Sequence, residues 1–173
     1  MKMSEELMKD AIEMFRGGDL KGAIANIEEK LKGNSDVAEL HHTYAEFANM
    51  LNMEVQEDVI PGGKIMMHYK KAMEFDEEND EYIADFASFA LECRRIPVAV
   101  KEFQRYAKRL ELADIPVDEV LYIAARSIVD SIEVMDPEKT NPMVQPWLKQ
   151  ALAWSVGGLG YSVEDAINML SNE

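Results

Sequence analysis

The sequence predicts an all-α protein, and three observations support this prediction. Apolar residues recur at three- and four-residue spacing along nearly the whole chain, which is the period of an amphipathic helix. No stretch of four to eight residues alternates between apolar and polar positions as cleanly as a half-buried strand would. Proline and glycine fall between the periodic segments, where they open one helix or end another.

The first two predicted helices cover residues 5–16 and 20–32. Ser4 is a candidate N-cap for the first of these helices, and Gly17 follows it with the freedom to adopt the left-handed conformation of a C-cap. Turn-forming residues at 33–36 follow the second helix. The first 36 residues are therefore expected to form a helical hairpin.

Seven further helices are predicted from the same periodicity. Pro61, Pro97, Pro116 and Pro137 separate several of them, because proline opens a helix or prevents its continuation. The predicted ranges are 36–53, 64–75, 80–94, 97–112, 117–135, 143–156 and 162–171. The chain is thus expected to contain about nine helices joined by short connections.

Length and charge narrow the class of protein. The chain has 173 residues, with 33 acidic and 18 basic side chains and a net charge of −15, so nucleic acid and anionic membranes are not expected partners. No apolar run approaches the ~18 residues that a membrane span needs. Cys93 is the single cysteine, and the charged N-terminal segment does not resemble a secretory signal. These features predict a cytosolic protein of one domain.

Small residues repeat along the chain at similar spacing. Ala11 and Ala45 lie 34 residues apart, Ala87 follows after 42 residues, and Ala124 follows after a further 37. A small residue where two antiparallel helices cross allows the backbones to approach each other. A single hairpin cannot bury its own apolar face, so repeated hairpins are expected to stack.

Two segments resemble the second-helix signature of tetratricopeptide repeats. Residues 18–24 read Gly-Asp-Leu-Lys-Gly-Ala-Ile, and residues 69–76 read Tyr-Lys-Lys-Ala-Met-Glu-Phe-Asp. The resemblance covers residues 5 to about 135 and implies a divergent, right-handed solenoid of antiparallel hairpins. The alternative is an irregular helical bundle whose hairpins merely have similar lengths. The implied units are about 5–36, 37–79, 80–116 and 117–156, followed by a capping helix at 162–171.

The resemblance also implies a concave groove lined by the first helix of each unit. Glu46 and other acids on these helices favour an apolar or mildly basic peptide or helix as the guest. The competing interpretation is that the apolar members face the core, as apolar residues at helical spacing usually do. The groove residues carried over by register are Met8, Ile12, Phe15, His42, Glu46, Asn49, Ser88 and Leu91.

A strip of cations lies on one predicted helix of this acidic chain. Lys101, Arg105, Lys108 and Arg109 share one face of the helix at 97–112, opposite its apolar stripe. The strip is either a docking surface for an acidic segment of a partner or an ordinary solvated helix face.

The sequence offers no complete set of residues for chemistry. His42 and Glu46 have the spacing of two metal ligands on one helix, but spacing supplies no third ligand. Cys93 is next to arginines, but spacing places no histidine beside it. We therefore expect no metal, no cofactor and no enzymatic activity.

The expected function is that of an adaptor that binds a peptide or helix of another protein in the concave groove. The alternative is a structural protein in which two copies form a homodimer through exposed edges of the helix stack.

Overall fold

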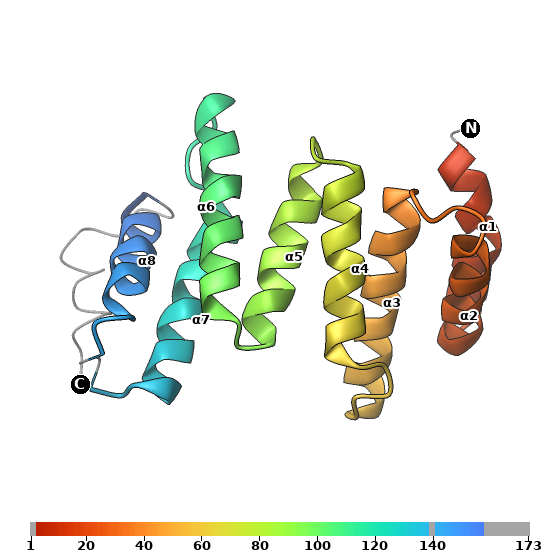
Figure 1. Cartoon of the computed structure of the whole chain (residues 1–173), viewed down its shortest axis with the longest axis horizontal. Coiled ribbons are helices and arrows are strands. Elements are labelled where there is room, and N and C mark those ends of the chain that lie inside the picture. Colours follow the sequence, from red (N-terminus) through yellow and green to blue (C-terminus); the bar gives the residue numbers. More distant parts are fainter. Residues whose placement is uncertain (1–2, 139–140, 158–173) are drawn as a thin grey trace. The chain divides into compact units, whose positions relative to one another are not determined.

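The computed structural model describes residues 3–138 and 141–157, which form eight α-helices and no strand (Figure 1). The prediction of an all-α protein is thereby confirmed. The ninth predicted helix, at 162–171, lies outside the described residues. None of the helices within the described ranges is long and apolar enough to cross a membrane. The helices are α1 (Met3–Arg16), α2 (Leu20–Leu31), α3 (Ala38–Val55), α4 (Gly62–Phe75), α5 (Asp80–Glu92), α6 (Ile96–Leu112), α7 (Glu119–Met135) and α8 (Gln145–Gly157).

Capping residues explain where several helices begin and end. The Asp19 carboxylate accepts a hydrogen bond from the Gly22 amide at 2.9 Å and opens α2. The Asp118 carboxylate does the same for the Leu121 amide at 3.2 Å, so α7 begins two residues later than predicted. Arg94 has a left-handed backbone with a φ of 59°, which ends α5 two residues before the predicted boundary.

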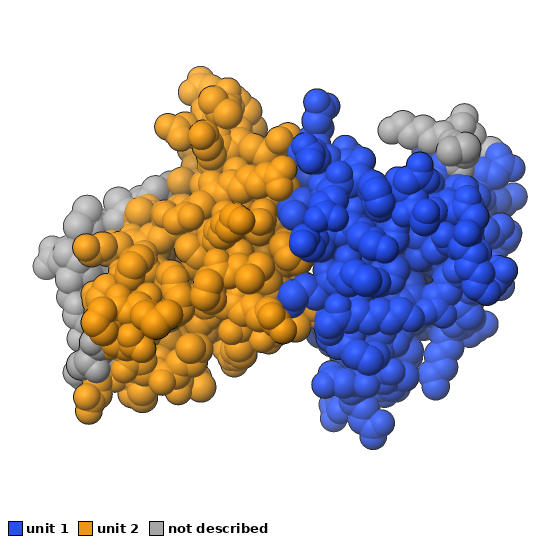
Figure 2. Space-filling view, in the orientation of Figure 1, with its two compact units in different colours: residues 1–82 blue, residues 83–173 orange. Residues whose placement is uncertain are grey.

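The chain divides into two compact units, residues 1–82 and residues 83–173 (Figure 2). The first unit contains α1 to α4 and the second contains α6 to α8, while α5 begins in the first unit and continues into the second.

In the first unit, each helix packs against the next one along the chain, and α1 also contacts α3. The Thr43 hydroxyl of α3 donates a hydrogen bond to the Met8 sulfur of α1 at 3.2 Å. Further along both helices, the rings of Phe15 and Phe47 stack with their centroids 4.7 Å apart. Because the two contacts advance in the same direction on both helices, α1 and α3 run parallel to each other.

In the second unit, α7 packs against α8, and α6 contacts both of these helices. The Phe103 ring of α6 meets the Trp154 ring of α8 edge to face, with centroids 6.1 Å apart. The Tyr106 hydroxyl donates a 2.6 Å hydrogen bond to Asp118 and so ties α6 to the start of α7. These contacts hold α6 against α7 and α8.

Burial in α7 predicts which substitutions the second unit tolerates. Ile128 is fully buried, whereas Ile123 of the same helix is 55% exposed. Ile128→Ala should lower the free energy of unfolding by about 2–5 kcal/mol, because it leaves a cavity in the packed core. Ile123→Ala should change it by less than about 0.5 kcal/mol. Urea unfolding followed by circular dichroism measures both values, and equal losses would contradict the packing of α7.

Candidate functional site

The second unit contains a cleft of about 590 Å³ between α5 and α7, here named the α5–α7 cleft. Two predicted groove residues, Ser88 and Leu91, both line it. The remaining apolar lining comes from Phe103 of α6 and from Val120, Ile123 and Ala124 of α7. Two of the eight predicted groove residues thus share one cleft, and the continuous groove that the resemblance implies stays a prediction.

Arg94 fixes one end of the α5–α7 cleft. Its left-handed backbone places the turn after α5 against α7, and its guanidinium donates a 2.8 Å hydrogen bond to the Ser131 hydroxyl. Ser131 is almost fully buried, so this hydrogen bond anchors the turn to the body of the unit. Glu92 and Asp130 also line the cleft, which gives its polar lining a net negative charge.

The other predicted groove residues belong to the first unit and have different environments. Met8 is buried beneath Thr43, and Ile12 is half-buried. Phe15 is 39% exposed, although one face of its ring is stacked on Phe47.

Three predicted groove residues lie on α3, and His42 is the buried one. The centroid of its ring lies 4.5 Å from the centroid of the Tyr82 ring. Its Nδ1 atom lies 3.8 Å from the Glu46 carboxylate one turn later, and Asn49 is half-buried. Met8 and His42 thus serve the packing of this unit, while Phe15 is the predicted groove residue with the largest exposed apolar ring.

The predicted cationic strip lies on α6, where its members differ in exposure. Lys101 and Lys108 are exposed, whereas Arg105 and Arg109 are half-buried. The Arg105 guanidinium lies 3.8 Å from the Glu102 carboxylate, so one cation of the strip already has an acidic neighbour.

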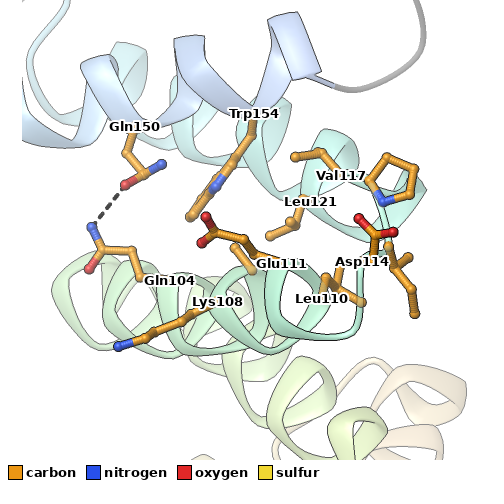
Figure 3. Close-up of a pocket in the computed structure, with 12 residues that line it drawn as sticks. Gln104, Lys108, Leu110, Glu111, Asp114, Val117, Leu121, Gln150 and Trp154 are labelled. Atoms are coloured by element: carbon orange, nitrogen blue, oxygen red, sulfur yellow. Dashed lines mark hydrogen bonds between the residues drawn. The ribbon is translucent and has the colours of Figure 1, made fainter.

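A second cavity of about 630 Å³ lies between α6, the α6–α7 loop, α7 and α8, and is named here the α6–α8 cavity (Figure 3). Trp154, Leu110 and Leu121 supply buried apolar surface. The Gln104 amide donates a 3.0 Å hydrogen bond to the Gln150 carbonyl group, which joins α6 to α8 beside the cavity. Sequence reasoning did not find this cavity, because its walls come from residues up to 50 positions apart.

A buried histidine pair in the first unit was also missed. The Nδ1 atoms of His41 and His68 lie 2.7 Å apart, and the His41 Nε2 atom lies 2.9 Å from the Ser35 carbonyl oxygen. Because a carbonyl oxygen only accepts, His41 Nε2 carries a hydrogen atom. In the neutral pair His41 Nδ1 therefore accepts, and His68 Nδ1 donates. Both rings line a cavity of about 480 Å³.

The environment disfavours a positive charge on either imidazole ring. Burial lowers the pKa of His68 to about 4, and the nearby positive charges of His41, Lys64 and Lys71 act in the same direction. Burial also lowers the pKa of His41, against the opposing effect of its hydrogen bond to Ser35. The pair is consequently neutral at pH 7.

A charged cluster beside the histidine pair joins three helices. Glu28 of α2 accepts hydrogen bonds from the Tyr44 hydroxyl of α3, at 3.1 Å, and from the Lys64 ammonium group of α4. The Lys64 ammonium group also lies 5.2 Å from the centre of the Tyr44 ring. The hydrogen bond from Lys64 is the main reason that the pKa of Glu28 is lowered.

Comparison with protein-family models and with curated proteins finds no match. The resemblance to tetratricopeptide repeats therefore rests on the residues of the chain itself.

The histidine pair predicts an acid-sensitive first unit. The pKa of His68 is about 4 in the folded protein and near 6.5 in the unfolded chain. Between these values the unfolded chain binds more protons, so stability must fall as the pH is lowered from about 6.5 to about 4. The expected contribution of His68 is a loss of about 3 kcal/mol. Urea unfolding at a series of pH values measures this loss.

The variant His68→Gln isolates this contribution. Its amide group can still donate to His41 Nδ1, but it does not titrate. The variant should therefore lose less than half as much stability as the wild type over the same pH interval. An identical pH dependence in the two proteins would show that the histidine pair is not the origin of the acid sensitivity.

Proposed function

We propose that this protein is a non-enzymatic adaptor that binds a short segment of another protein in the α5–α7 cleft. The observation that carries the proposal is that Ser88 and Leu91 line a concave surface together with the exposed Ile123 of α7. Such a surface offers an apolar anchor point and polar groups around it, which is the usual anatomy of a peptide-binding site.

The arrangement of helices within each unit supports a repeat architecture for this adaptor. In the first unit, α1 and α3 are the first helices of successive hairpins, and they lie beside each other in parallel. In the second unit, α5 and α7 hold the same positions in their hairpins and share a cleft. Both observations fit hairpins stacked as a right-handed, tetratricopeptide-like solenoid whose first helices line one face.

The chemistry of the α5–α7 cleft favours a guest with a large apolar side chain next to a lysine or arginine. The exposed Ile123 and the half-buried Val120 provide apolar contact, and Glu92 and Asp130 provide negative charge. Arg94 already donates to Ser131, which reduces its availability to an anionic guest. The net charge of −15 would also attract a basic segment over longer distances.

The residues of the cleft support binding rather than catalysis. Three serines line it, and the described lining brings no histidine or cysteine beside them. A serine nucleophile needs an adjacent base, and the neighbour of Ser131 is instead a guanidinium group. The single cysteine and the acidic composition agree with a cytosolic setting for such an adaptor.

The proposal predicts a different effect for two matched substitutions on α7. Ile123 and Val134 are both exposed aliphatic residues, but only Ile123 lines the cleft. The ligands for this test come from random displayed peptides that are selected for binding to the full-length protein. The selected peptides should be enriched in an apolar residue next to a basic one. Ile123→Asn should weaken binding of the selected peptides about tenfold, because it removes an apolar anchor point. Val134→Asn should leave the dissociation constant unchanged.

Titration of synthetic copies of the selected peptides provides the measurement. Equal affinity for the two variants would place the binding surface outside the α5–α7 cleft and overturn the proposal. Failure to select any peptide, combined with a molecular mass that doubles with concentration, would favour a structural homodimer instead.

A further inference from the structure

The cavity beside the buried histidine pair contains an imidazole nitrogen without a partner. This cavity of about 480 Å³, here named the α2–α4 cavity, is lined by residues of α2, α3 and α4 and by Ser35. His68 is 7% exposed, and its hydrogen bond joins its Nδ1 atom to the Nδ1 atom of His41. Within the described part of the chain, the Nε2 atom of His68 makes no hydrogen bond.

The His68 Nε2 atom presents a lone pair to the α2–α4 cavity. Among the described residues, fully enclosed side-chain nitrogen or oxygen atoms without a hydrogen bond belong to Asn26 and Glu102. His68 Nε2 is not one of them, so it has accessible surface in the cavity that its residue lines. The Ser35 carbonyl keeps a hydrogen atom on His41 Nε2, and His68 Nδ1 must then donate to His41 Nδ1. In the neutral ring, His68 Nε2 therefore acts as an acceptor.

A lysine ammonium group is the uncompensated charge of the α2–α4 cavity. Glu28 lines the cavity and forms an ion pair with Lys64. Glu29 also lines it and forms an ion pair with Lys32. Lys71 lines it as well and is half-buried, and no described residue forms an ion pair or a hydrogen bond with its ammonium group. Each carboxylate thus has its own cation, whereas Lys71 has no anion.

The charges around His68 favour an anion as the ligand. Burial is the main reason that the pKa of His68 is lowered to about 4. The nearby positive charges of His41, Lys64 and Lys71 lower this pKa further, and the opposing effect of Glu28 is the smallest. The ring is consequently neutral at pH 6, and it lies in a region of positive charge.

We propose that the α2–α4 cavity binds a phosphate group, which places an anionic oxygen on the Lys71 ammonium group and donates an O–H group to His68 Nε2. Lys71 follows His68 by three positions on α4, so the two side chains share one face of the helix. Phosphate meets both requirements, because it is an anion that retains an O–H group near neutral pH. This site lies in the first unit and does not depend on the function proposed for the α5–α7 cleft.

Two sources could supply this group, namely free inorganic phosphate or a phosphate monoester of a larger molecule. The probes are inorganic phosphate for the first source and methyl phosphate for the second. Their counterparts are sulfate and methyl sulfate, which are tetrahedral anions of similar size without an O–H group. At pH 6 about half of the methyl phosphate retains its O–H group, because the second pKa of a phosphate monoester is near 6. Sulfate carries more negative charge than dihydrogen phosphate, so attraction between charges alone would favour sulfate.

Titration of the full-length protein at pH 6 tests the proposal. The net charge of −15 repels any anion, and about 0.15 M sodium chloride largely screens charges more than about 8 Å away. A long-range nitrogen–proton correlation spectrum resolves the ring nitrogens of each histidine, and His68→Gln assigns the His68 signals.

The His68 Nε2 signal should move toward the position of a hydrogen-bonded nitrogen when a phosphate is added. At least one phosphate should bind with a dissociation constant about tenfold lower than that of its sulfate counterpart, because the lone pair of His68 needs a donor. The phosphate that binds more tightly identifies the source. Equal affinities for phosphates and sulfates would overturn the proposal, as would a His68 Nε2 signal that neither phosphate moves.

Two matched substitutions on α4 then locate the charge recognition. Lys71→Gln should raise the dissociation constant of the bound phosphate about tenfold, because the anion loses its cationic partner. Lys70→Gln changes the net charge equally, but Lys70 is exposed, lies 3.6 Å from the Glu74 carboxylate and is outside the described cavity lining. It should therefore have little effect. Equal effects of the two variants, both checked for native helix content by circular dichroism, would overturn the proposed site.

Discussion

The close approach of neighbouring helices is the constraint on which the rest of each unit depends. Ala11 and Ala23 of the first hairpin are fully buried, as are Ala45 and Ala72 of the second. In the second unit α6, α7 and α8 each contain a fully buried alanine, namely Ala99, Ala125 and Ala151. Adding methylene groups at tightly packed positions costs about 1–3 kcal/mol, because the backbones must separate. Small residues set the helix spacing, and the larger side chains decide where clefts remain.

Local signals explain why the helices could be predicted from the sequence alone. Every predicted helix within the described residues is present with boundaries shifted by at most two residues. Periodicity located the helices, and caps such as Asp19 and Asp118 refined their ends. The four alanines on which the predicted repeat rests, Ala11, Ala45, Ala87 and Ala124, are all buried. How the two units are arranged is a property of long-range packing, and the prediction of a single solenoid domain remains a prediction.

Whether a candidate site could be predicted depends on how far apart its residues lie in the sequence. Ser88 and Leu91 were predicted as groove residues by counting along the predicted repeat, and both line a cleft. Periodicity could not decide which apolar positions face the core, and Met8 is an example of a buried one. The α6–α8 cavity and the pair of His41 and His68 depend on contacts across 46 and 27 residues respectively. No local spacing encodes such contacts.

The two cavities of the second unit lie on different faces of α6, and this separation follows from helix geometry. Phe103 lines the α5–α7 cleft, whereas Gln104 lines the α6–α8 cavity. Consecutive residues of an α-helix point about 100° apart, so adjacent positions serve different surfaces. The edge-to-face contact between Phe103 and Trp154 joins the wall of the cleft to the wall of the cavity. This pair is therefore one direct contact between the two walls, and the consecutive residues Val120 and Leu121 of α7, which line the cleft and the cavity respectively, provide another.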